Sequence, residues 1–386
     1  MFDRQITQRF LTALDRIAYG SLEVTTPDGK LHRFHGTQPG AAAIFILHDW
    51  RVVPAMLCRG DVGLAETYRD GWWDSPDPAS LFLFGLQNQD ALDAYIYGSL
   101  FGRVASRLAY FLSSNTVSGS KKNIHAHYDL GNDFYSLWLD GSMTYSSAIF
   151  DDAQTPLAIS QQRKYDRIVD RINPNGSLLE IGCGWGGFAE RALQRGDYGI
   201  KALTLSPAQH AFASRRVGKG AVVALEDYRH QQGRYDQIVS IEMFEAVGEK
   251  FWPVYFSQIQ SLLANKGKAV VQTITIADAA FDSYRKSGDA IRSFIFPGGM
   301  LPSPEKFRAA GAQAGLRVTD EFAFGQDYAL TLTHWLKNFD ARVKDIMALG
   351  FDEKFIRMWR FYLTSCIATF KHGRTDVIQW ELQHAA

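Results

Sequence analysis

The sequence predicts an α/β protein built on a doubly wound, mostly parallel sheet, with a smaller α+β unit before it and a helical tail after it. Strand and helix signals alternate along the second part of the chain, which is typical of a parallel sheet covered by helices. A glycine-rich turn joins one apolar strand to a helix. The chain has 386 residues, of which 46% are hydrophobic and 21% are charged, so two domains are expected.

The first domain, residues 1–112, is expected to be the small α+β unit. An amphipathic helix is predicted over residues 3–19, followed by two short strands in SLEVTTPDGKLHRFHG around the turn Pro27-Asp28-Gly29. Apolar side chains on one side of residues 91–112 predict a further helix.

The polar stretch SSNTVSGSKKN, residues 113–123, predicts a linker, so the second domain covers residues 124–386. Hydrophobic patterning predicts its strands and helices. Strands are expected at residues 177–181, 200–204, 221–225, 237–241 and 268–276, with helices at 187–195, 207–217, 251–264 and 304–314. Residues 316–324 and 329–335 are expected to pair as the last strands, and the tail from residue 339 onward to be helical.

The charge balance and the cysteines restrict the function classes. The chain has 41 Lys and Arg against 41 Asp and Glu, so no global field favours nucleic acid, and a basic membrane contact must be a local patch. The 3 cysteines lack metal-ligand spacing, which predicts free thiols, a reducing compartment and no metal site. The charged N-terminus and the short apolar runs predict neither a secretory signal nor a membrane span. A cytoplasmic location is therefore expected.

The glycine loop predicts a nucleotide-type ligand. Gly182, Gly184 and Gly187 follow an apolar strand and open a helix, although a tight turn without any ligand has the same spacing. A dinucleotide site usually has an acid at the end of the second strand, but here that strand ends ALTLS. Glu180 instead lies two residues before the first glycine, as in motif I of the class I methyltransferases. A carboxylate there suits the cationic S-adenosylmethionine better than NAD, and it can also order the loop itself.

Longer segments carry a more specific resemblance. HAHYDLGNDFYSLWLDGSMTYSSAIFDD, LLEIGCGWGG, LTLSPAQ, YDQIVSIEMFEAVG, VQTITI and FPGGMLPS occur in this order. In these segments the chain resembles the cyclopropane-fatty-acyl-phospholipid synthases and the mycolic acid methyltransferases over nearly its whole length. The resemblance implies a class I methyltransferase, Rossmann-like fold and an S-adenosylmethionine-dependent C-methyltransferase.

The resemblance also implies the site residues. The cofactor site would comprise Tyr145, Ser146, Glu180, Gly182, Gly184, Thr204, Gln209, Asp227 and Tyr228, with the last two at the adenine. The family holds a bicarbonate ion at its reaction centre, and the matching positions here are Ser147, Glu245, Gln272, Ile274 and Tyr328. Ser147 replaces a Cys, Gln272 replaces a His, and Ala246 stands where a His usually follows the Glu. These departures leave open whether bicarbonate binds.

The expected reaction is methyl transfer to the double bond of an unsaturated acyl chain of a membrane phospholipid. Loss of a proton from the added methyl closes a cyclopropane, whereas a hydride shift gives a methyl-branched or methylene chain, and both products stay open. Glu245 is the first candidate for the charge beside the carbocation, with a structural helix-start carboxylate as the alternative. The rings of Tyr128, Phe134, Tyr145 and Tyr328 are candidates to face the cation or to fill the core.

Access to the membrane has two candidate segments. Arg103 and Arg107 lie one turn apart on the helix expected over residues 91–112, and Arg285, Lys286 and Arg292 lie in the apolar segment 281–300. The family's N-terminal extension implies a homodimer, and the protein would associate peripherally with the inner face of the membrane. A small-molecule methyltransferase, an inactive lipid-binding homologue and a nicotinamide enzyme remain alternatives.

Overall fold

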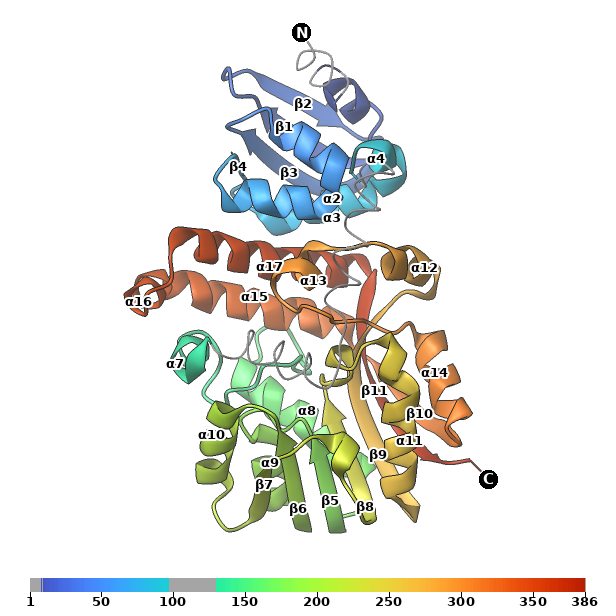
Figure 1. Cartoon of the computed structure of the whole chain (residues 1–386). Coiled ribbons are helices and arrows are strands. Elements are labelled where there is room, and N and C mark those ends of the chain that lie inside the picture. Colours follow the sequence, from blue (N-terminus) through green and yellow to red (C-terminus); the bar gives the residue numbers. More distant parts are fainter. Residues whose placement is uncertain (1–7, 9, 97–129, 386) are drawn as a thin grey trace. The chain divides into compact units, whose positions relative to one another are not determined.

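The computed structural model describes residues 8, 10–96 and 130–385 of the chain (Figure 1). Two compact units divide these residues, and the division does not follow a single cut along the sequence. Unit 1 contains the described part of Met1–Ser113 together with Asp282–Pro297 and Val343–Arg374, and unit 2 contains the rest. The sequence analysis placed both later segments in the second domain. The predicted linker, residues 113–123, lies outside the described residues.

Unit 2 is a seven-stranded sheet in the order β10-β11-β9-β8-β5-β6-β7. The strands β5 to β9 are parallel to one another, and β11 runs antiparallel to both of its neighbours. This confirms the predicted doubly wound fold. The strands are β5 Asn175–Ile181, β6 Asp197–Thr204, β7 Ala221–Leu225, β8 Tyr235–Ile241, β9 Leu263–Ile276, β10 Leu316–Ala323 and β11 Thr375–His384.

Helices follow the strands of unit 2 as the alternating pattern predicts (Figure 1). Ser206 accepts a hydrogen bond from the amide of Gln209, and Pro207 takes the first helical position, so α10 begins where the sequence indicates. The remaining helices pack around the sheet. They are α7 Gly131–Ser136, α8 Leu157–Arg171, α9 Gly187–Arg195, α10 Pro207–Val217, α11 Trp252–Leu262, α14 Pro304–Gln313 and α15 Gly325–Ala341, with α12 Asp278–Lys286 crossing into unit 1.

Two predictions at the C-terminal end are wrong. Residues 329–335 form part of α15 rather than a strand, because Ala329, Leu332 and Trp335 are buried at helical spacing. Thr331 and Thr333 donate hydrogen bonds to the carbonyls four residues earlier, which accommodates them in a helix. The last strand is β11 instead, at the end of the tail that was expected to be helical.

Unit 1 contains a four-stranded sheet in the order β2-β1-β3-β4. The predicted turn is confirmed, since β1 and β2 pair antiparallel on either side of it. The expected helix over residues 91–112 lies mostly outside the described residues, which include only its start in α4. The elements are β1 Tyr19–Thr25, β2 Leu31–His35, β3 Gln38–Leu47, α2 Val52–Arg69, β4 Trp73–Asp74, α3 Pro78–Gln87 and α4 Gln89–Ile96, with α13 Ala290–Phe294, α16 Val343–Ala348 and α17 Glu353–His372 from later in the chain.

Helix α17 belongs to unit 1 because it packs on α2 and α3. The guanidinium of Arg357 donates to the carbonyls of Tyr68 and Trp73 and pairs with Asp74 at 2.8 Å. The helix ends at Gly373, which adopts a left-handed conformation with φ of 76°. This glycine separates a helix of unit 1 from β11 of unit 2, a boundary that the continuous apolar patterning of the tail does not reveal.

Candidate functional site

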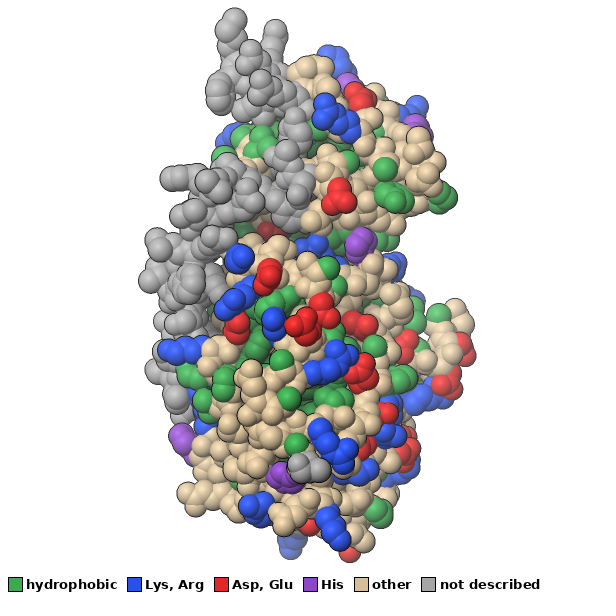
Figure 2. Space-filling model, turned by 90° about the vertical axis from the view of Figure 1, so that its right-hand side faces the viewer, with side chains coloured by type: hydrophobic (Ala, Val, Ile, Leu, Met, Phe, Trp, Pro, Cys, Tyr) green, Lys and Arg blue, Asp and Glu red, His purple; other side chains and the backbone are tan. Residues whose placement is uncertain are grey.

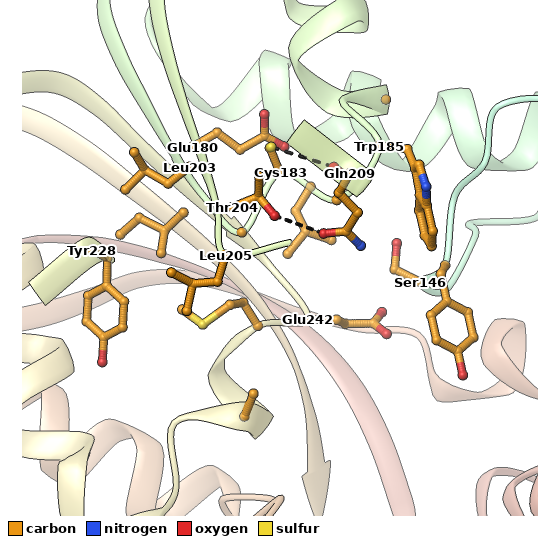
Figure 3. Close-up of a pocket in the computed structure, with 18 of the residues that line it drawn as sticks. Ser146, Glu180, Cys183, Trp185, Leu203, Thr204, Leu205, Gln209, Tyr228 and Glu242 are labelled. Carbon is orange, nitrogen blue, oxygen red and sulfur yellow. Dashed lines mark hydrogen bonds between the residues drawn. The ribbon is translucent and has the colours of Figure 1, made fainter. Parts of the chain in front are cut away.

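A pocket lies at the carboxyl ends of β5 and β8 in unit 2 (Figure 3). The order of the strands reverses between these two neighbours, since β6 and β7 follow β5 on one side and β9 follows β8 on the other. Open α/β sheets bind their ligands at this kind of switch point. The fold alone therefore places a ligand where the glycine loop was found.

The predicted cofactor residues come together around this pocket. All nine line it, namely Tyr145, Ser146, Glu180, Gly182, Gly184, Thr204, Gln209, Asp227 and Tyr228. In Figure 3, Tyr228 lies at one end and Ser146 and Trp185 lie at the other. Trp185, expected to wall the same pocket, also lines it.

The glycine loop is shaped by backbone angles that favour glycine. Gly182 and Gly184 have φ of 83° and 52°. The amide of Gly182 donates to the carbonyl of Leu203 at 3.1 Å, which ties the loop to the end of β6. A Cβ on Gly187 would lie 2.9 Å from the hydroxyl of Tyr165, so a larger residue here would have to displace the end of that side chain. The loop thus leaves its backbone open to the pocket.

Glu180 is a buried acid with unused hydrogen-bonding capacity. Its side chain is 2% exposed, and its Oε2 has no hydrogen-bond partner among the described residues. Burial raises the pKa of Glu180 to about 8, although the nearby Lys164 opposes this shift. A buried carboxyl oxygen without a donor can accept a hydrogen bond from a bound ligand. A cationic ligand would supply that donor and restore the charged form.

A second acid, Asp227, lies at the opposite end of the pocket, and its pKa is lowered rather than raised. Both oxygens of Asp227 accept hydrogen bonds from Arg229, the closest at 2.6 Å. Burial alone would raise the pKa of Asp227, but the hydrogen bonds from Arg229 outweigh it and the pKa lies below its ordinary value. Between the two acids, the hydroxyl of Thr204 donates to Gln209 at 2.9 Å. Asp227 therefore presents a fixed negative charge.

The reaction-centre residues surround a carboxylate that the sequence analysis did not single out, that of Glu242. Its Oε1 accepts from the amide of Ser147 at 2.9 Å and from the side chain of Gln272 at 2.7 Å. Its Oε2 accepts from the hydroxyl of Tyr328 at 2.5 Å. Glu242 lines the pocket and directly follows β8, as Glu180 belongs to the end of β5. Its place directly after a strand of the sheet was the only feature of the sequence that could have identified Glu242 as a site residue.

Glu245 and Ile274 bond to each other instead. The amide of Ile274 and the hydroxyl of Thr273 both donate to Oε1 of Glu245, at 2.5 Å and 2.9 Å. Oε2 of Glu245 is buried with no partner among the described residues. Burial, followed by repulsion from Glu242, raises the pKa of Glu245 to about 8. Its donors come from β9 and not from the start of a helix, so the role of Glu245 beside the cation stays a prediction.

Ser147 contributes through its backbone. Its hydroxyl donates to the carbonyl of Ala148 at 3.0 Å, while its amide binds Glu242. The exchange of Cys for Ser at this position therefore leaves the backbone donor in place. Gln272 is held from behind, because its Oε1 accepts from Gln379 at 3.0 Å and Gln379 accepts from Arg167 at 2.8 Å. This relay turns the Gln272 amide nitrogen toward Glu242.

A buried lysine, Lys164, interacts electrostatically with Glu242 and Glu180. Lys164 of α8 is 0% exposed and donates to the hydroxyl of Ser146 at 2.5 Å. Burial lowers the pKa of Lys164 to about 7, and attraction to Glu242 opposes this shift. Burial likewise raises the pKa of Glu242, and attraction to Lys164 opposes it. The sequence analysis missed Lys164, because a lysine in an amphipathic helix usually lies on the solvated face.

The other candidate side chains have different fates. Tyr145 lines the pocket, Phe134 packs instead against Tyr135 and Trp138, and Tyr128 lies outside the described residues. Cys183 is buried in the core and also lines the pocket. Within the described ranges, no group of acids, histidines and cysteines could hold a metal ion.

The two membrane candidates also differ from expectation. Arg103 and Arg107 lie outside the described residues. Arg292 is 5% exposed, pairs with Asp289 and donates to backbone carbonyls, so it cannot present its charge to a membrane. Arg285 and Lys286 are exposed on α12. None of the helices in the described part of the chain is long and apolar enough to span a bilayer.

Comparisons with known proteins identify the family of the chain. A family model described as mycolic acid cyclopropane synthetase matches residues 116–380. The tuberculostearic acid methyltransferase UfaA1 of Mycobacterium tuberculosis is 35% identical over 361 residues, which cover 89% of this chain and 84% of that protein. The cyclopropane-fatty-acyl-phospholipid synthase of Escherichia coli K12 is 33% identical over 382 residues, which cover 93% and 94%. The crystal structure of the mycolic acid cyclopropane synthase CmaA1 complexed with SAH and CTAB matches with a TM-score of 0.64 and 31% identity, covering 68% of this chain and 98% of that one.

Proposed function

The chain belongs to the mycolic acid cyclopropane synthetase family of S-adenosylmethionine-dependent methyltransferases, and on this premise we propose that it methylates the double bond of an unsaturated phospholipid acyl chain to give a cyclopropane. The observation that carries the proposal is the pocket in which the cofactor residues meet the half-buried Glu242. The relatives methylate lipids according to their names, and the phospholipid acceptor comes from the second of them.

The cofactor residues fit S-adenosylmethionine by charge. The free oxygen of Glu180 would accept a hydrogen bond from the ammonium group, since a buried carboxylate binds best to a cationic donor. Asp227 and Tyr228 would meet the adenine at the opposite end, with Thr204 and Gln209 between them. When bound, the cofactor supplies an electrophilic methyl group on a sulfonium.

The reaction centre would then position the double bond of the acyl chain beside the methyl group. The π electrons of the double bond form the new bond to the methyl carbon, while the electrons of the carbon–sulfur bond pass to sulfur. This leaves a cation on the acyl chain. The negative charge of Glu242 and the ring of Tyr145 line the same pocket and would stabilise that cation. A base must next remove a proton from the added methyl, and the freed electron pair closes the ring. Ser147, Gln272 and Tyr328 would hold that base, with Glu245 and Ile274 behind it.

Unit 1 is proposed to serve access to the membrane or dimerisation, and the protein to work as a homodimer on the cytoplasmic side. Basic and acidic side chains are intermixed on the face shown in Figure 2, so contact with an anionic bilayer would depend on a local patch. The exposed Arg285 and Lys286 form one such candidate. Sedimentation of the purified protein tests the dimer, which a monomer at working concentration would contradict.

The proposal is tested by incubating the enzyme with methyl-labelled S-adenosylmethionine and vesicles of monounsaturated phospholipid, then identifying the labelled chains by mass spectrometry. A ring-bearing chain is expected. A methylene chain would assign the alternative product, because a hydride shift then moves the cation to the methyl-bearing carbon before the methyl loses its proton. Binding of S-adenosylmethionine without any labelled lipid would overturn the proposal in favour of an inactive homologue or a small-molecule acceptor.

A further inference from the structure

The carboxylate of Glu242 occupies a set of donors that has a known purpose in the family. Ser147, Gln272 and Tyr328 are three of the five positions at which the resemblance implies bicarbonate ligands, and each donates to Glu242. The fourth, the amide of Ile274, is already bound to Glu245, which is the fifth. The hydrogen-bond donors expected for a free ion are therefore used by carboxylates of the chain itself.

We infer that the side chain of Glu242 replaces the bicarbonate ion of the reaction centre and acts as the base of the proposed methylation. A glutamate carboxylate presents two oxygens in one plane, as bicarbonate does toward its donors. Two of the donors bind Oε1 and one binds Oε2, so both oxygens are oriented. This inference rests on the proposed function, because a base is needed only if the acyl chain is methylated.

The backbone supports a functional role for Glu242. The described part of the chain contains two non-glycine residues with positive φ, Met143 at 52° and Glu242 at 48°. Both line the pocket. Backbone angles of this kind cost energy outside glycine and are concentrated at functional sites. The strained angle directs the Glu242 side chain into the pocket and toward the side that carries Ser146, as Figure 3 shows.

The neighbouring acids Glu242 and Glu245 differ in which protonation state their surroundings favour. Burial raises the pKa of Glu242, but its three donors and the nearby Lys164 oppose that shift and favour the charged form. Glu245 has a buried oxygen without a donor among the described residues, which favours its protonated form. Two buried carboxylates that repel each other do not both ionise readily. Glu242 is thus placed to carry the charge and Glu245 the proton.

The chemical step balances without an added ion. After the alkene has taken the methyl group, one C–H bond of that methyl breaks. Its proton passes to the carboxylate of Glu242, and its electron pair forms the last bond of the ring. The resulting carboxylic acid returns the proton to solvent before the next turnover. Wild-type activity should therefore not depend on bicarbonate.

The test compares Glu242→Gln, Glu242→Gly and the wild type in carbon-dioxide-free buffer with and without added bicarbonate. Glu242→Gln should lose about 10²–10⁴-fold in turnover, the range expected for loss of a general base. In Glu242→Gly the backbone keeps its positive φ without strain, because glycine adopts such angles readily. Removal of the side chain also frees the three hydrogen-bond donors for an ion, so added bicarbonate should restore part of the activity. Glu321→Gln, at an exposed acid on β10, controls for the exchange of a carboxylate for an amide.

Two further measurements do not depend on turnover. Calorimetry with S-adenosylhomocysteine should give wild-type affinity for both Glu242 variants, and ¹³C-bicarbonate should show a protein-bound NMR signal only for Glu242→Gly. A wild-type enzyme that methylates lipid but requires bicarbonate, or binds it at the donors, would overturn the inference and leave the proposed function standing. A wild-type enzyme that methylates no lipid would instead overturn the proposed function.

Discussion

The site has a cofactor end and a reaction-centre end, and these differ in how far they depart from the residues that the resemblance implies. At the cofactor end, all the residues that the resemblance implies are present and meet around one cavity. At the reaction centre, two of the five implied residues are exchanged and an additional acid, Glu242, takes their hydrogen bonds. The comparison teaches that the site keeps its cofactor chemistry while the source of its base changes. The two ends should accordingly respond to mutation in separable ways.

The largest effect outside Glu242 is expected at the cofactor end. Glu180→Gln removes the charge that would bind the ammonium group, so affinity for S-adenosylmethionine should fall about 10–100-fold, as for a lost hydrogen bond to a charged group. Turnover at saturating cofactor should change far less. Calorimetry and steady-state kinetics measure the two quantities. Unchanged affinity would show that Glu180 only orders the glycine loop.

Glu245→Gln separates the two neighbouring acids. The amide keeps the acceptor for the Ile274 and Thr273 donors and resembles the protonated acid, so turnover should fall about tenfold or less. Affinity for the cofactor should stay unchanged. Rates measured beside those of Glu242→Gln give the comparison directly. An equal loss in the two variants would mean that the charge resides on Glu245, and a joint loss of activity and cofactor binding would assign it a folding role.

Gln272→Leu tests the assignment of Glu242 as the base through the pH dependence of the rate. The hydrogen bond from Gln272 favours the charged form of Glu242, so its removal raises the pKa of Glu242. A higher pH is then needed to ionise the base, and the acidic limb of the kcat/KM profile should move to higher pH. Gln194→Leu, at an exposed glutamine on α9, is the control. A uniform loss of rate without displacement of that limb would contradict the role of Gln272.

The smallest effect is expected far from the chemistry. Neutralising either Arg285 or Lys286 by exchange for Gln should weaken binding to anionic vesicles about fivefold, the effect of one basic side chain near a charged surface. Flotation with labelled vesicles measures this, with Lys219→Gln on an exposed loop as the control. Equal flotation of both proteins would remove α12 from the membrane contact.

The sequence predicted local features better than assembled ones. The boundaries of α9 and α10 and the glycine loop follow from periodicity and glycine spacing within short segments, and α10 also has the capping residue Ser206. The hydrogen bonds of the reaction centre could not be predicted, because Ser147, Glu242, Gln272 and Tyr328 come from four distant segments. Only the tertiary structure shows which acid accepts from the three donors. The burial of Lys164 was missed for the same reason.

The C-terminal errors have a different cause. The threonines of residues 329–335 indicated a strand, yet burial of one face and hydrogen bonds to preceding carbonyls stabilise α15. Strand β11 was missed because its pairing with β9 and β10 depends on partners far away in the sequence. The assignment of α17 to unit 1 likewise depends on contacts such as that between Arg357 and Asp74.

The most direct test is a crystal structure of the wild-type protein with S-adenosylhomocysteine, grown in bicarbonate buffer. The account predicts the carboxylate of Glu242 on the donors of Ser147, Gln272 and Tyr328, with the cofactor product along the glycine loop. A planar three-oxygen ion bound to those donors, with Glu242 turned away, would contradict it.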